Sequence, residues 1–128
     1  MENTIQISTG AVKLKFTDDF GELRGVLKVN PSDIGEANKI FTLSMELEER
    51  QSEYEKKIKQ AKTEKEQLEI LLESCEYLKK SIDYIYGAGS SLMLFGEANT
   101  FRMFEDFFKG ITPLYQKASK EKTKKYKQ

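Results

Sequence analysis

The feature that most constrains the fold is a long run, from Glu36 to Tyr86, that contains neither glycine nor proline. Pro31 and Gly35 precede this run, and Gly87 follows it. Because glycine and proline are the residues that most often interrupt helices, the run predicts one long helix or a pair of helices. Apolar residues recur in it at intervals of three and four, which is the spacing of one helix face.

The heptad pattern of this run leaves two arrangements open. The d-type positions in its middle are Arg50, Lys57 and Glu64, which do not form a buried seam. A continuous rod of about 50 residues would be about 75 Å long at about 1.5 Å per residue. An antiparallel pair that turns near residues 59–64 instead buries the apolar ends of the run against each other within one chain, and we favour it. The residues it buries are Ile40, Leu43, Leu47, Leu71, Leu78 and Ile82.

The first 30 residues alternate between apolar and polar types as strands do. Val12, Leu14 and Phe16 point to one face, and residues 17–22 read as a turn. We expect a β-hairpin that pairs residues 11–17 with 23–29, and a further short strand at residues 4–8. A lone hairpin is marginally stable in water, so this one should pack on the helices or pair with another chain.

Three glycines divide the C-terminal third of the chain. Gly87 and Gly89 stand where the long helical run ends, and Gly96 follows a short apolar segment. A final helix is expected to carry the phenylalanines at its start and to continue past Pro113.

The sequence therefore predicts an α+β fold that is predominantly helical. It divides into three parts: a β-hairpin at 1–30, a long charged helix or helical hairpin at 31–86, and a helical cap broken by glycines at 87–128. The cap ends in a lysine-rich tail, in which we expect the cations to lie favourably near a helix C-terminus.

The composition argues against catalysis and against a metal site. Histidine is absent and Cys75 is the single cysteine, so catalytic pairs built on histidine and structural zinc sites are excluded by counting. The glycine-containing segment 87–91 matches neither of the two common phosphate-binding patterns, G-x-x-x-x-G-K-[ST] and G-x-G-x-x-G. We expect no catalytic residue, no metal and no cofactor, and we expect Cys75 to be a core residue.

Charge and hydropathy bear on partners and location. Lys+Arg and Asp+Glu each total 21, so the net charge gives no reason to expect nucleic acid or a membrane surface as a partner. No apolar run approaches the roughly 20 residues of a membrane span, and the N-terminus lacks the pattern of a signal peptide. We expect a cytoplasmic protein.

The apolar residues around the final helix have two readings. They form a core, or they form a groove for a partner helix, because they offer more aromatic area than a small core needs. The candidate partner-binding residues are Phe95, Phe101, Phe104, Phe107, Phe108 and Leu114.

The order of motifs in this region resembles that of the tail assembly chaperones of siphophages and prophages from Gram-positive bacteria. The chain has IDYIYGAG at 82–89, LFG at 94–96, FEDFF at 104–108 and ITP at 111–113. Members of that family typically carry an "IDxxFG-G" break, a second "FG" and a helix of the form "FxxFFxxITP". Tyr86 departs mildly from the pattern, which often has phenylalanine there.

The resemblance implies a non-enzymatic helper in the cytoplasm of an infected or lysogenic bacterial host. Such proteins bind the tape measure protein and keep it soluble while the major tail tube protein assembles around it. Two alternatives stay open: a structural protein of the phage tail or virion, and a host coiled-coil regulatory or scaffold protein. Self-association is compatible with each of the three.

Overall fold

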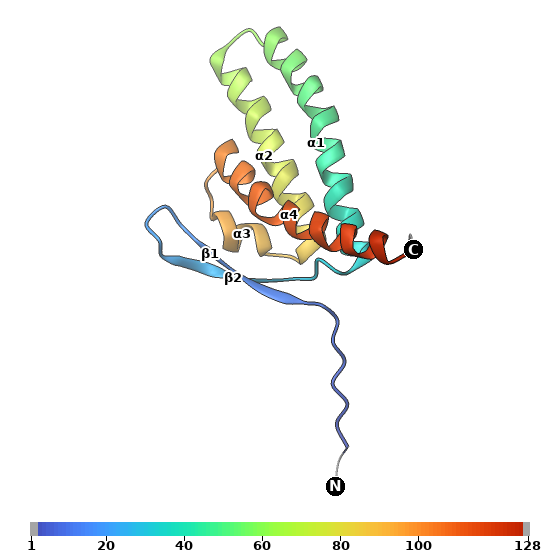
Figure 1. Cartoon of the computed structure of the whole chain (residues 1–128). Coiled ribbons are helices and arrows are strands. Elements are labelled where there is room, and N and C mark those ends of the chain that lie inside the picture. Colours follow the sequence, from blue (N-terminus) through green and yellow to red (C-terminus); the bar gives the residue numbers. More distant parts are fainter. Residues whose placement is uncertain (1–2, 127–128) are drawn as a thin grey trace.

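The computed structural model describes residues 3–126, which form an α+β fold dominated by helices, as the sequence predicts. The elements follow in the order β1 (Val12–Thr17), β2 (Leu23–Val29), α1 (Ile34–Gln60), α2 (Glu64–Tyr86), α3 (Ser90–Phe95) and α4 (Phe101–Tyr126). Figure 1 shows α1 and α2 side by side, α4 crossing in front of them, and the β-hairpin beneath α3 and α4.

The strands β1 and β2 form the predicted antiparallel hairpin. Val12 lies opposite Val29 and Leu14 lies opposite Leu27, so these apolar residues share the face that turns toward the helices. The carboxylate of Asp18 holds the turn by accepting hydrogen bonds from the backbone N–H groups of Phe20 and Glu22, at 2.9 and 3.0 Å. The prediction of a strand at residues 4–8 is wrong for this chain alone. The segment is extended, but within residues 3–126 no strand lies beside it to supply ladder hydrogen bonds.

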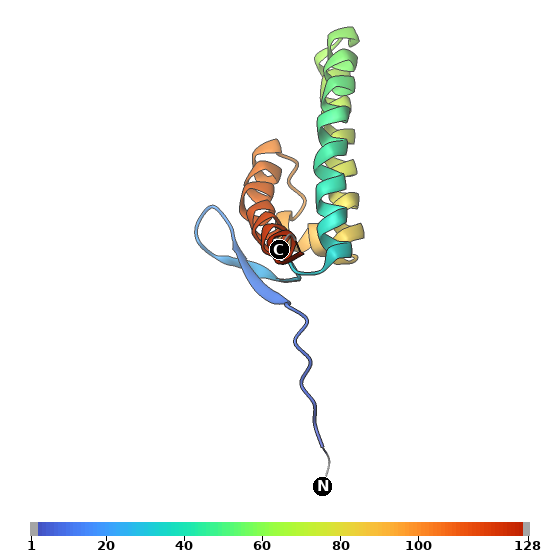
Figure 2. The ribbon, with the colours of Figure 1, turned by 45° about the vertical axis from the view of Figure 1, so that its right-hand side comes forward.

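The long run without glycine folds as the antiparallel pair and not as a rod (Figure 2). Its turn spans residues 61–63, between α1 and α2. Thr63 Oγ1 accepts a hydrogen bond from the backbone N–H of Glu66 at 3.1 Å, while the Glu66 carboxylate accepts one from the backbone N–H of Lys62 at 2.8 Å. These two bonds satisfy backbone donors that the start of α2 would otherwise leave unpaired.

Spacing of three and four residues predicts that Leu68 lies on the same face of α2 as Leu71, Cys75 and Leu78. Near the turn, however, the face that α2 directs toward α1 is shifted by one position. Leu71 is half-buried and Ser74 is buried, whereas Leu68 is 65% exposed. A residue next in sequence to the seam is rotated about 100° away from it on a helix. On the polar side of the seam, Tyr77 donates a hydrogen bond of 2.6 Å to Glu46, and the Arg50 guanidinium lies 3.7 Å from the centroid of the Tyr77 ring.

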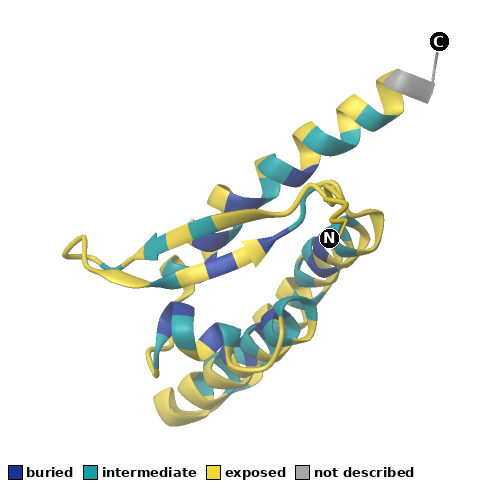
Figure 3. Cartoon of the chain, turned by 90° about the horizontal axis from the view of Figure 1, so that it is seen from below, coloured by how far each residue is buried: buried dark blue, intermediate teal, exposed yellow. Residues whose placement is uncertain are grey.

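The core lies where the β-hairpin, the base of the helix pair and α4 meet (Figure 3). Phe107 stands at its centre, with its ring centroid 6.0 Å from that of Phe16 and 5.8 Å from that of Phe95. Gly25 of β2 permits close packing of α3, because a Cβ at that position would lie 2.4 Å from the sulfur of Met93. The buried members of this core are Leu27, Val29, Ile40, Cys75, Leu78, Ile82, Leu94, Phe95, Phe104, Phe107, Ile111 and Tyr115.

Cys75 is 2% exposed, which confirms its predicted place in the core. Burial raises the pKa of its thiol. Gly87 ends α2 with a φ of 111°, as predicted from its position.

A chain of hydrogen bonds joins four elements at the base of the molecule. The Glu36 carboxylate accepts from the backbone N–H of Asn30 at 2.5 Å and from the hydroxyl of Tyr115 at 2.8 Å. The hydroxyls of Tyr115 and Tyr86 lie 2.6 Å apart. Since the single hydroxyl proton of Tyr115 goes to Glu36, Tyr86 is the donor in this last bond. The chain links the end of β2 and the start of α1 to α4 and the end of α2.

Replacing Tyr115 with phenylalanine should destabilise the fold by about 1–3 kcal/mol, because it leaves the half-buried Glu36 carboxylate and the half-buried Tyr86 hydroxyl without their shared partner. Urea unfolding measures the change. Tyr84→Phe is the matched control, since Tyr84 is 73% exposed. Equal stability of the Tyr115→Phe and Tyr84→Phe variants would contradict a structural role for this chain of hydrogen bonds.

The hydrogen-bonded tyrosines Tyr86 and Tyr115 should also make the fold less stable at alkaline pH. Burial raises the pKa of both Tyr86 and Tyr115 above the ordinary tyrosine value of about 10. The stabilisation that comes from these protonated tyrosines is complete below about pH 10 and is lost as the pH rises above it, because the unfolded chain releases its protons first. The urea midpoint should fall as the pH rises above about 10, and less steeply in a variant with phenylalanine at both positions. If the urea midpoint falls equally steeply with pH in wild type and in the double phenylalanine variant, these tyrosines are not the cause of the loss.

Candidate partner-binding groove

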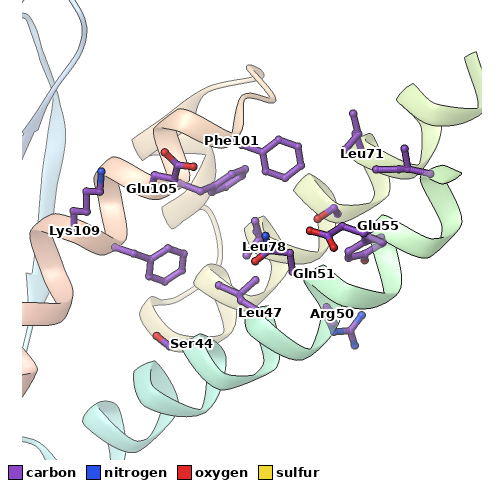
Figure 4. A pocket seen from close by; sticks show the side chains of 15 residues that line it. Ser44, Leu47, Arg50, Gln51, Glu55, Leu71, Leu78, Phe101, Glu105 and Lys109 are labelled. Atoms are coloured by element: carbon purple, nitrogen blue, oxygen red, sulfur yellow. The ribbon is translucent and has the colours of Figure 1, made fainter. Parts of the chain in front are cut away.

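An elongated hollow lies between α4 and the helix pair (Figure 4). It has a volume of about 570 Å³ and is lined by residues from α1, α2 and α4. It exists because α4 packs on the rest of the molecule through one buried side, while its first turns diverge from the helix pair (Figure 2). We call this hollow the groove.

The floor and walls of the groove are apolar. Leu47 of α1 and Leu78 of α2 lie on one side, and Phe101, Phe104 and Phe108 of α4 face them from the other. Phe101 is 41% exposed, so part of its ring stands in the mouth of the groove. Exposed aromatic area of this kind is typical of a surface that contacts another molecule.

Charged and polar side chains form the rim. Glu55 lies on the α1 side, and Glu105 and Lys109 lie on the α4 side (Figure 4). The guanidinium of Arg50 is directed to the Tyr77 ring instead. The rim therefore carries both acidic and basic residues. An apolar trough with a rim of both charges fits an amphipathic helix, whose apolar face fills the trough while its flanks meet the rim.

The six predicted partner-binding residues do not share one surface. Phe95, Phe104 and Phe107 are buried, with exposed fractions of 7%, 3% and 4%. Phe101, Phe104 and Phe108 come together along the groove, whereas Phe95 and Phe107 belong to the aromatic core beside the β-hairpin. Leu114 is half-buried farther along α4 and is not among the residues that line the groove. Binding of a partner by any of the six stays a prediction.

The opposite wall was missed, because Leu47 was assigned to the seam between the two helices and no binding role was given to Tyr54 or Ile58. Leu47, Tyr54 and Ile58 of α1 line the groove and are all half-buried. Their spacing of seven and four residues places them on one helix face. That face extends toward the tip of the pair, where α2 alone does not cover it. The regular spacing was therefore the available signal.

Within residues 3–126, no group of three or more His, Cys, Asp or Glu side chains is arranged to hold a metal ion. In the same part of the chain, no helix is both long and apolar enough to cross a membrane.

Comparisons with known proteins give one match. Neither the curated proteins nor the solved structures contain a protein that matches this chain. A family model described as "Family of unknown function (DUF6673)" matches residues 26–128, a span that begins within β2 and includes all four helices. Because the match covers most of the chain, the protein belongs to the DUF6673 family.

Proposed function

We propose that this protein is a tail assembly chaperone of a siphophage or prophage, which binds the tape measure protein and keeps it soluble during tail morphogenesis. The role is non-enzymatic and is carried out in the cytoplasm of the bacterial host. The observation that carries the proposal is the apolar groove with its charged rim, because it suits a long helical client better than a small molecule.

The polarity of the groove favours an amphipathic helix as the bound element. A helix with its side chains is about 10–12 Å across and presents an apolar stripe at every third or fourth residue. Phe101 and the half-buried Leu47 and Phe108 offer aromatic and aliphatic contacts on both walls of the groove. A client helix that covers them removes apolar surface from water on both partners.

The motifs that carry the family resemblance also build this part of the molecule. The segment 82–89 forms the end of α2 and the break before α3, and 94–96 ends α3. The segments 104–108 and 111–113 lie in α4 and supply one wall of the groove and part of the core. The motifs thus have a shared structural use, which is to hold α4 beside the helix pair.

The test is co-expression with a candidate tape measure protein from the same phage or prophage. Phe101→Ala should weaken the complex by about 2 kcal/mol, or about thirtyfold in dissociation constant, because it removes an anchor at the mouth of the groove. The measurement is the amount of soluble tape measure protein and the affinity of the purified complex. Phe101 is exposed enough that the unfolding free energy should change by no more than about 1 kcal/mol.

Phe20→Ala is the matched control. Phe20 is 88% exposed and lies in the hairpin turn, outside the groove. If folded Phe101→Ala protein solubilises the tape measure protein as well as wild type does, the groove is not the binding site. Presence of the protein in purified virions would instead favour the structural alternative.

A further inference from the structure

The segment before β1 is an extended arm with a strand-like pattern. Figures 1 and 2 show it leading away from the body of the molecule. Ile5 and Ile7 are 85% and 80% exposed, although both are strongly apolar. In an extended chain they share one face, while Thr4, Gln6 and Ser8 lie on the other. The arm therefore has the amphipathic pattern of a strand that is not paired.

The point at which the arm leaves the body is fixed. The side-chain amide of Asn30 donates a hydrogen bond of 2.8 Å to the carbonyl oxygen of Thr9. Gly10 has a φ of +90°, and a Cβ there would lie 2.9 Å from the Cβ of Ser32. These contacts hold residues 9 and 10 against the turn after β2. They direct the arm outward, so it does not reverse to lie along β1 of its own chain.

The hairpin offers a free strand edge of matching length. Within residues 3–126 the sheet has two strands, so the outer edge of β1 leaves backbone N–H and C=O groups without ladder partners. Six residues of β1 span about 20 Å, and the seven residues of the arm from 3 to 9 span about 23 Å. Leu14 and Phe16 form the inner apolar row of this strand, and Lys13 and Lys15 lie on its outer face.

We propose that the arm of one copy of this chain adds as a third strand to the β1 edge of a second copy. Ile5 and Ile7 then extend the inner apolar row of Leu14 and Phe16, and the polar residues of the arm join the outer face. Each copy carries both an arm and an edge, so reciprocal exchange pairs both arms and both edges in a closed dimer.

The charges of the hairpin favour this arrangement over direct pairing of two β1 edges. Edge-to-edge pairing would bring Lys13 and Lys15 of one copy beside the same lysines of the other, which is unfavourable. The arm from residue 3 to residue 9 carries no charged side chain, so it approaches the same edge without that repulsion.

Analytical ultracentrifugation of the full chain across a range of concentrations tests the proposal. Wild type should dimerise. Ile5→Glu combined with Ile7→Glu should weaken the dimer about a hundredfold or more, because two buried apolar contacts are replaced by charges. Thr4→Glu combined with Gln6→Glu is the matched control. It adds the same charge on the outer face, beside the lysines, and should leave the dimer intact.

Amide hydrogen exchange locates the contact. The β1 amides on the free edge should be protected in the wild-type dimer and should lose that protection in the Ile5→Glu, Ile7→Glu variant. A wild-type chain that stays monomeric at about 100 µM overturns the proposal. So does a dimer that survives Ile5→Glu and Ile7→Glu, or one that both double variants disrupt equally.

Discussion

The burial of one side of α4 between the β-hairpin and the helix pair is the contact on which the rest of the structure depends. Phe104, Phe107, Ile111 and Tyr115, spaced three and four residues apart, are all nearly inaccessible to water. They touch elements from both ends of the sequence, so this single stripe closes a core that neither the hairpin nor the helix pair completes alone. Apolar contacts alone do not fix an orientation. The hydrogen bond from the Tyr115 hydroxyl to Glu36 fixes how α4 lies across α1.

The groove exists because the buried stripe of α4 is narrow. On a helix, residues seven apart point almost the same way, so Phe101 and Phe108 share a direction. Phe107 is turned about 100° from Phe108 and faces the hairpin, where it meets Phe16. Phe104 lies between these directions and contributes to both the core and the groove. The aromatic face of α4 is thus wider than the surface the chain provides to cover it.

Local sequence patterns predicted the helices and strands well. They predicted poorly which neighbouring element covers each apolar residue. Period-2 alternation gave the hairpin in nearly correct register, and the missing d-type residues gave the antiparallel pair. The turn was placed near residues 59–64, but the role of Glu66, which accepts a hydrogen bond from the backbone N–H of Lys62, was not recognised. Helical spacing identified the phenylalanine face, but it does not say which neighbour covers each part of that face. The exposed Phe101 was for that reason grouped with the buried Phe107.

Residues 4–8 do alternate between apolar and polar types, as a strand does. The sequence does not reveal whether a strand of the same chain lies near enough to pair with them.

The two candidate binding surfaces lie on opposite sides of α4, and this arrangement affects how they work together. Figure 2 shows the β-hairpin on one side of α4 and the helix pair, which forms the far wall of the groove, on the other. The arm and the β1 edge share no residue with the lining of the groove. A dimer formed through the arms therefore leaves both grooves open, so one assembly presents two apolar troughs. Two linked sites raise the effective concentration of the second once the first has bound. Under the proposed function, a helical client long enough to reach both grooves would be captured more tightly than by either groove alone.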